Sequence, residues 1–198
     1  MFCVHATRPA PSPPSGYRFA AVASERLDGD PVFLIKGRAE RFRERFPSPH
    51  ACYGFTTESG EVVAFFWLTL ARAQAVEVPF RYGLNIKIEP RQAYVWDCAT
   101  AAEHQNRGLY RTGLALTAAE AAAGGASSVF IITDLDNHAS IRGIEAASGQ
   151  ELGRFSVAQS GPLRTIGSSA GGVHVRLRGQ AIGFGALTTA VARTPLRA

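Results

Sequence analysis

Residues 93–143 read AYVWDCATAAEHQNRGLYRTGLALTAAEAAAGGASSVFIITDLDNHASIRG, and this stretch decides the fold. Its first seven residues have the half-apolar character of a β-strand, in which successive side chains point to opposite faces of the sheet. The alternation predicts one face with Tyr94, Trp96 and Cys98, and an opposite face with Val95, Asp97 and Ala99.

A helix and a second strand follow. The helix is expected from about Asn106 to Ala123, and the glycine pair at 124–125 is a typical C-terminal stop. Residues 129–133 are short and apolar, as expected for a buried parallel strand. A strand, a crossover helix and a second strand form a right-handed unit with parallel strands. The stretch therefore predicts an α/β fold.

The turn that opens the helix has the features of an anion-binding site. The first amides of a helix have no acceptor within the helix, and the helix dipole favours negative charge there. Gly108 lets an anion approach the backbone, and three nearby side chains could add donors: Asn106, Arg107 and Arg111. The turn is a candidate pyrophosphate site, and the alternative is an ordinary turn that contains one glycine.

The second strand is followed by another helix start. Residues 134–137 form a turn, and Asn137 is a natural N-cap for a helix from His138 to about Ser148. Ile141 and Ile144 would point to the same side of this helix.

Two motifs in this region resemble the GCN5-related N-acetyltransferase (GNAT) superfamily. Gln105-x-x-Gly108-x-Tyr110 is similar to the family's Arg/Gln-x-x-Gly-x-Gly/Ala loop, except that Tyr110 replaces a small residue. Asn137-x-x-Ser140 resembles the family's Asn-x-x-Ser/Ala segment. The order, the spacing and the elements between the motifs agree with the family over about residues 90–158.

The resemblance implies a fold and a cofactor site. The fold is a GNAT-like α/β (α+β) architecture: a mixed, twisted central sheet whose two parallel strands splay apart, flanked by helices. Acetyl-CoA, or another acyl-CoA, enters the split. The implied cofactor-binding residues lie on the first strand, on the turn and at the next helix start: Cys98, Ala99, Thr100, Gln105, Asn106, Arg107, Gly108, Leu109, Tyr110, Arg111, Asn137 and Ser140.

The resemblance implies direct acyl transfer to an amine, with a backbone N–H at Cys98 or Ala99 stabilising the oxyanion. Many relatives place an acidic tyrosine seven residues after the asparagine, a position that Ile144 occupies here. Tyr110 and Ser140 are the substitutes within reach, and Asp97 is the candidate base. Alternatives for the base are Glu103 and His104. Asp97 could equally be a structural hydrogen-bonding residue, Asn137 a plain N-cap, and Cys98 either a nucleophile or a small buried residue.

The rest of the chain predicts one domain, 17–180, after a flexible proline-rich leader over 1–16 and before a C-terminal tail, 181–198, of uncertain structure. Strands are expected at 17–22, 51–55, 61–70 and 76–88, with a last pair at 151–158 and 173–178 joined by a loop. A helix is expected over 37–46, with Phe42 on its apolar face and Arg45 on its polar face.

Composition limits the function classes. The net charge of +5 suits anionic partners, but the arginines are scattered, which argues against nucleic acid. Three separated cysteines support neither a zinc site nor a disulfide framework, so no metal is expected and the cytoplasm is the simplest compartment. No stretch is long and apolar enough for a membrane span. The oligomeric state stays open, with a homodimer as one option.

The sequence therefore predicts an acetyl-CoA-dependent N-acetyltransferase acting on an amine of a small molecule or a peptide. Two other functions remain: a longer-chain acyltransferase using acyl-CoA or acyl carrier protein, and a non-catalytic acyl-CoA-binding regulatory domain.

Overall fold

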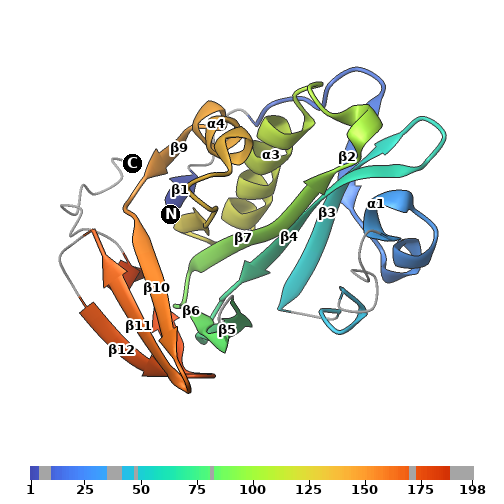
Figure 1. Cartoon of the computed structure of the whole chain (residues 1–198). Coiled ribbons are helices and arrows are strands. Elements are labelled where there is room, and N and C mark those ends of the chain that lie inside the picture. The colour runs from blue at the N-terminus through green and yellow to red at the C-terminus, as the bar shows by residue number, and fades with distance from the viewer. Residues whose placement is uncertain (5–9, 35–41, 47–48, 81–82, 170–172, 188–198) are drawn as a thin grey trace.

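The computed structural model describes residues 1–4, 10–34, 42–46, 49–80, 83–169 and 173–187. Its main sheet has seven strands in the order β2-β3-β4-β7-β8-β1-β9 (Figure 1). The strands run over Phe2–Val4 (β1), Tyr17–Ala21 (β2), His50–Thr57 (β3), Val62–Leu70 (β4), Gln92–Thr100 (β7), Ser128–Ile131 (β8) and Gly149–Glu151 (β9).

β4 is the central strand of the antiparallel half of the sheet. The turn at Gly60, where φ is +86°, connects it to β3. Residues 62–69 of β4 are all buried, because helices or loops cover both faces of the sheet there. This burial on both faces suits the strand expected at 61–70, whose residues are almost all apolar.

β7 and β8 are parallel and pair over only four residues each. Gln92–Val95 pairs with Ser128–Ile131, and the remaining residues of β7, 96–100, extend beyond β8. The two parallel strands therefore separate at their carboxyl ends, which confirms the predicted split. The expected fold class is confirmed as well.

A β-bulge in β7 corrects the predicted face assignment. Trp67 of β4 faces Trp96 and Phe65 faces Ala99, so two residues of β7, Asp97 and Cys98, lie opposite Phe66 alone. Asp97 adopts a left-handed conformation with φ of +50°. The extra residue reverses the alternation beyond it. Cys98 therefore packs on the same side as Val95, and Ala99 on the side of Trp96, against the expected grouping.

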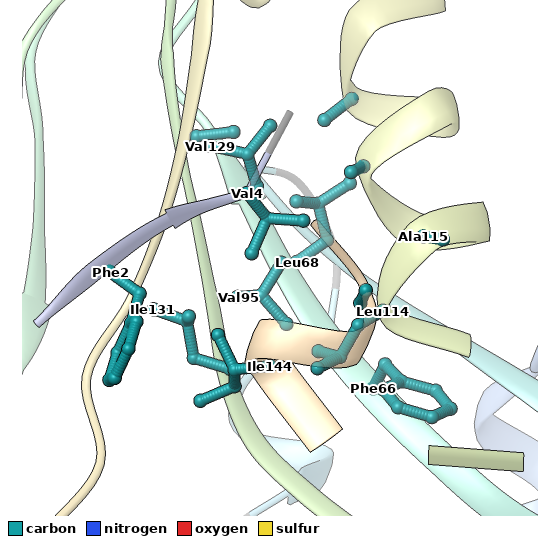
Figure 2. Close-up of a cluster of buried hydrophobic side chains, with 14 of the residues drawn as sticks. Phe2, Val4, Phe66, Leu68, Val95, Leu114, Ala115, Val129, Ile131 and Ile144 are labelled. Carbon is teal, nitrogen blue, oxygen red and sulfur yellow. The ribbon is translucent and has the colours of Figure 1, made fainter. Parts of the chain in front are cut away.

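Two helices cover the Val95 side of the sheet, α3 (Leu109–Ala123) and α4 (His138–Ala146). Both confirm predicted helices, although α3 begins three residues later than expected. Figure 2 shows Leu114 of α3 and Ile144 of α4 among the buried side chains of the sheet. Gly113 lets α3 approach the sheet, because a Cβ there would lie 2.1 Å from Cζ of Phe66. Close packing of α3 against β4 fixes where its N-terminus lies.

The first residues of the chain form a strand inside the sheet, which corrects the predicted flexible leader. β1 lies between β8 and β9 and is antiparallel to both, with Cys3 opposite Phe130 and Gln150. Phe2 and Val4 are buried in the core beside Ile131 (Figure 2). Their apolar side chains stabilise the strand because they fill the space between the sheet and the helices.

Two smaller sheets differ from the expectations at 76–88 and 151–178, and one of them includes residues 181–183 of the expected tail, whose residues 188–198 lie outside the described residues. The predicted single strand at 76–88 is a hairpin, which β13 then joins in parallel. The expected last pair of strands is a three-stranded antiparallel sheet in the order β10-β11-β12, whose middle strand was missed. Their bounds are Val76–Pro79 (β5), Asn85–Ile88 (β6), Phe155–Ser160 (β10), Leu163–Ser168 (β11), Val173–Leu177 (β12), Ala181–Gly183 (β13) and, following it, Phe184–Leu187 (α5).

The opposite face of the main sheet is covered by the segment between β2 and β3. It contains η1 (Ser24–Asp28), α1 (Pro31–Leu34) and residues 42–46. Phe33 and Phe42 are fully buried against Phe65 and Trp67 of β4. Residues 37–41, half of the helix expected over 37–46, lie outside the described residues. Arg45, which was assigned to a polar face, has only 16% of its side chain exposed.

Candidate active site

A pocket of about 490 Å³ lies at the split between β7 and β8. Its walls come from the end of β7, the connection into α3, the first turn of α3 and one side of α4. The lining residues are Cys98, Ala99, Thr100, His104, Gln105, Asn106, Gly108, Leu109, Tyr110, Arg111, Asn137, Ala139, Ser140, Arg142, Gly143 and Ala146.

The connection between β7 and α3 turns sharply at Gly108. It passes through a short 3-10 helix, η4 (Ala102–His104), and reaches α3 through Asn106 and Gly108, both left-handed with φ of +58° and +76°. Thr112 donates its amide to the Gly108 carbonyl at 3.0 Å and so closes the first turn. The preceding amides lie at the start of α3, where the helix supplies no acceptor. This geometry is suited to an anion.

The open edge of β7 presents backbone groups to the same pocket. Ala101 donates its amide to the Val63 carbonyl of β4 at 2.8 Å. Because hydrogen bonding alternates along a strand, we expect the amide of Ala99 to face β4 as well, and the carbonyl of Cys98 and the N–H and C=O groups of Thr100 to face the open edge. The Thr100 carbonyl accepts a hydrogen bond from Nε2 of Gln105 at 3.4 Å, which agrees with this direction.

The charges around the pocket favour an anionic ligand. Its lining has two arginines, Arg111 and Arg142, and no aspartate or glutamate. The guanidinium of Arg111 lies over Gly108, since a Cβ at Gly108 would be 3.4 Å from Nε of Arg111. Arg107, the third predicted donor, points elsewhere: its guanidinium donates to the Tyr17 hydroxyl and to the Glu103 carbonyl. The other predicted cofactor-binding residues all line the pocket.

Tyr110 and Ser140 meet across the pocket. The two hydroxyl oxygens are 2.6 Å apart and join the first turn of α3 to the first turn of α4. Burial raises the pKa of the Tyr110 phenol well above its ordinary value, with a further contribution from the nearby Cys98. Tyr110 is therefore protonated throughout the neutral range, as a proton donor must be.

Ile144, at the position of the family's usual tyrosine, is fully buried in the core and lies outside the pocket. Asn137 is the N-cap of α4, since its side-chain oxygen accepts the Ser140 amide at 3.1 Å. The same residue lines the pocket, so Asn137 can cap the helix and form part of the pocket wall at the same time.

Asp97 does not line this pocket. Its carboxylate binds the guanidinium of Arg45 at 2.8 Å, on the other face of the sheet. Arg45 in turn lies over the aromatic rings of Trp96, Phe42 and Trp67, with distances to the ring centroids of 4.0, 4.6 and 5.4 Å.

The remaining catalytic candidates differ in position. His104 lines the pocket, and its Nδ1 is 2.9 Å from the Tyr17 hydroxyl. Glu103 is exposed and is not a lining residue. Burial, with the negative charge of Asp97, raises the pKa of the Cys98 thiol well above its ordinary value. A protonated thiol is a weak nucleophile, which disfavours covalent chemistry at Cys98.

Four lining residues were missed from the sequence, and all of them lie on α4. Ala139, Gly143 and Ala146 recur at helical spacing and present a small-residue face to the pocket, next to Arg142. Gly143 faces Tyr110, because a Cβ there would lie 2.4 Å from Cδ1 of the tyrosine. The helical spacing of positions 139, 143 and 146 was the signal in the sequence that could have located this face. The signal is weak because small residues differ little in hydrophobicity from their neighbours.

Within the described residues, no helix is long and apolar enough to cross a membrane, and no group of three potential metal-ligating side chains is found.

Comparison with known proteins places this architecture. A profile of the acetyltransferase (GNAT) family matches residues 20–148. No curated protein matches the sequence. Similar solved structures include the aminoglycoside 6'-N-acetyltransferase AAC(6')-Ih from Acinetobacter baumannii, with 12% identity, a TM-score of 0.54, and coverage of 73% of this chain and 98% of that one.

Two further structures resemble the chain to a similar degree. AAC(6')-Iy in complex with a bisubstrate analogue, CoA-S-monomethyl-acetylneamine, has 12% identity and a TM-score of 0.54, covering 74% of this chain and 99% of that one. A ribosomal-protein-alanine N-acetyltransferase from Brucella melitensis biovar Abortus has 11% identity and a TM-score of 0.52, covering 73% and 99%. At these identities the likeness concerns the fold.

Proposed function

Because the chain belongs to the acetyltransferase (GNAT) family, it is an acyltransferase that uses acetyl-CoA and acetylates an amine, and we propose that the pocket at the β7–β8 split is where it does so. One pocket, whose lining has no aspartate or glutamate, brings together the open edge of β7, the first turn of α3 and the Tyr110–Ser140 pair. This is the observation that carries the proposal.

The residues present fit acetyl-CoA in three parts. The open-edge backbone of Cys98 and Thr100 supports hydrogen bonds to the amide-rich pantetheine arm, as a further strand would make. The amides at the start of α3 and the close approach at Gly108 suit the pyrophosphate. Arg111 and Arg142, which line the pocket, supply positive charge for the third phosphate of CoA, the one outside the pyrophosphate.

Acetyl-CoA supplies a thioester whose carbonyl carbon accepts the amine while the CoA sulfur leaves. For this step, the Cys98 amide is the proposed donor to the thioester oxygen, because Cys98 lines the pocket at the bulge of β7, whereas alternation directs the Ala99 amide to β4. The Tyr110 hydroxyl is the proposed acid for the leaving sulfur, and Ser140 orients it. His104, through water, is the proposed base, because it lines the pocket and Asp97 does not.

The acceptor is proposed to be an amine of a small molecule or of a peptide. Similar folds include enzymes named for aminoglycosides and for a ribosomal-protein alanine, which span both classes. A cytoplasmic location is proposed because the cytoplasm contains acetyl-CoA and keeps cysteines reduced. A homodimer is proposed as the alternative to a monomer.

The test is release of CoA thiol from acetyl-CoA in the presence of an amine panel that includes an aminoglycoside, a polyamine and a peptide with N-terminal alanine. Amine-dependent release, with acetylated product seen by mass spectrometry, is the expected result. Tight acetyl-CoA binding without turnover on any amine would favour the non-catalytic domain, for which the absence of tyrosine at position 144 is the motive. Faster turnover with longer acyl-CoA would favour the long-chain alternative.

A further inference from the structure

Asp97 occupies the bulge of β7 in a backbone conformation that residues other than glycine rarely adopt. Its φ is +50°, in the left-handed region, which is strained for most residues that carry a Cβ. The carboxylate is bound by Arg45 at 2.8 Å, and 27% of the Asp97 side chain is exposed. The conformation is therefore held by a contact from outside the strand.

Arg45 is itself held in place. Its guanidinium lies 4.0 Å from the ring centroid of Trp96, the residue before Asp97. Trp96 donates from Nε1 to Oγ1 of Thr69 at 2.9 Å, and Oγ1 of Thr69 is 2.8 Å from Nδ1 of His50. This chain of contacts fixes Arg45 against β3, β4 and β7 together. A cation bound to an aromatic face and to a carboxylate has little freedom to move.

The backbone consequence falls on the next residue. The N–H of Cys98 belongs to the peptide group between Asp97 and Cys98, so the Asp97 dihedral angles set its direction. Cys98 lines the pocket, and the proposed function assigns its N–H to the thioester oxygen. Loss of the Arg45 contact would let Asp97 relax toward the ordinary extended conformation and turn this peptide group.

We propose that Arg45 is a positioning residue: through its salt bridge with Asp97, it locks the β7 bulge so that the Cys98 amide points at the thioester oxygen of acetyl-CoA. The inference rests on the proposed function of the pocket. It gives Asp97 a structural role from the face of the sheet opposite the cofactor, and it joins the 42–46 segment to the reacting end of the pocket.

The test compares the affinities for acetyl-CoA and for CoA, which differ only in the acetyl group that the Cys98 amide would bind. We expect Arg45→Met to weaken acetyl-CoA binding about tenfold, the value of one hydrogen bond of about 1.4 kcal/mol, while CoA binding changes less than about twofold. Arg43→Met is the matched control, because Arg43 lies in the same segment and pairs with the exposed Asp28. It should alter neither affinity.

A second variant tests the backbone mechanism. Glycine adopts a positive φ without strain, so Asp97→Gly removes the need for the lock. In the Asp97→Gly background, Arg45→Met should no longer change the ratio of the two affinities. A full effect of Arg45→Met in that background would overturn the inference, as would equal losses of CoA and acetyl-CoA affinity. Loss of a general base would leave this binding ratio unchanged, so the readout separates the two roles of Asp97.

Folding and the proposed function are checked in the same experiment. If Arg45→Met does not fold, Arg45→Lys replaces it: lysine keeps the charge but loses the planar stacking, and a partial fall in the ratio is expected. A wild-type protein that binds neither CoA nor acetyl-CoA would overturn the proposed function and the inference together. A wild-type protein that prefers acetyl-CoA, with the same preference in both Arg45 variants, would overturn the inference alone.

Discussion

The ring of Tyr110 occupies the space that a side chain at Gly143 would need. A Cβ on Gly143 would lie 2.4 Å from Cδ1 and 2.8 Å from Cε1 of the tyrosine. The tyrosine replaces a small residue of the family's loop motif, and the glycine on α4 makes room for it. The two positions therefore form one unit, which brings the phenol to the Ser140 hydroxyl.

This relationship predicts strong coupling between the two positions. We expect Gly143→Ala to lower the free energy of unfolding by about 1–3 kcal/mol, because the new methyl group overpacks the Tyr110 ring. In the Tyr110→Ala background the same change should cost less than about 0.5 kcal/mol. Urea unfolding of the four proteins measures the cycle, and additive costs would contradict the assignment of the clash.

Removal of the Tyr110 hydroxyl should slow catalysis and spare cofactor binding. We expect Tyr110→Phe to reduce kcat about 10²-fold, the lower range for a general acid, with acetyl-CoA affinity nearly unchanged. Ser140→Ala should have a smaller effect, since it leaves the phenol in place. Tyr53→Phe is the control, because Tyr53 is also half-buried but does not line this pocket. A kcat that survives Tyr110→Phe would assign the acid elsewhere.

A charge at Gly108 should abolish cofactor binding. We expect Gly108→Glu to lower acetyl-CoA affinity more than about 100-fold, because it places a bulky anion where the pyrophosphate is proposed to bind. Gly125→Glu is the matched control: it also has a positive φ, +95°, but lies after the far end of α3. Calorimetric titration gives the affinities, and similar losses in both variants would point to general destabilisation.

Ser148, after the C-terminus of α4, is held at φ +63°. Glycine fits this position without strain, so Ser148→Gly should raise the free energy of unfolding by about 0.5–1 kcal/mol. Ser148→Ala keeps the Cβ and should bring no gain. Denaturant titration compares the three proteins, and equal stability of the glycine and serine forms would show that the conformation is not strained.

His50 makes stability depend on pH. Burial, with the positive charge of Arg45, lowers the pKa of His50 below its ordinary 6.5. The unfolded chain therefore takes up this proton at higher pH than the folded protein does. The folded protein therefore keeps the stability that depends on neutral His50 above pH 6.5, and it loses this stability as the pH falls below that value. His50→Gln should flatten the decline in melting temperature between pH 6.5 and 5, and an unchanged slope would exclude His50 as its source.

The donor half of the site was predictable because it depends on local sequence. A glycine at a helix start and an asparagine cap at the next helix start have direct backbone consequences, and both lie on the pocket. Periodicity also located both strands of the central hairpin, the crossover helix α3 and the helix α4 that follows the crossover unit.

The lock on the β7 bulge was not predictable, for a reason seen at Asp97. A strand pattern assumes strict alternation, and nothing in the residue type marks a bulge where an aspartate adopts the left-handed conformation. Its partner Arg45 lies 52 positions away, in a run of arginines that reads as a solvated helix face. The role of each residue depends on the salt bridge between them, which the periodicity of the sequence does not reveal.

The position of β1 bears on how the chain reaches its fold. Cys3 pairs with residues 127 and 147 positions later in the chain, at Phe130 and Gln150. During synthesis the first strand must therefore wait until nearly the whole domain has emerged, and until then β8 and β9 each keep an unpaired edge. We expect slow, late protection of the Phe2–Val4 amides in pulsed hydrogen exchange. During this interval the vacant slot can also accept the same strand from a second copy, so crowded refolding should yield strand-exchanged dimers.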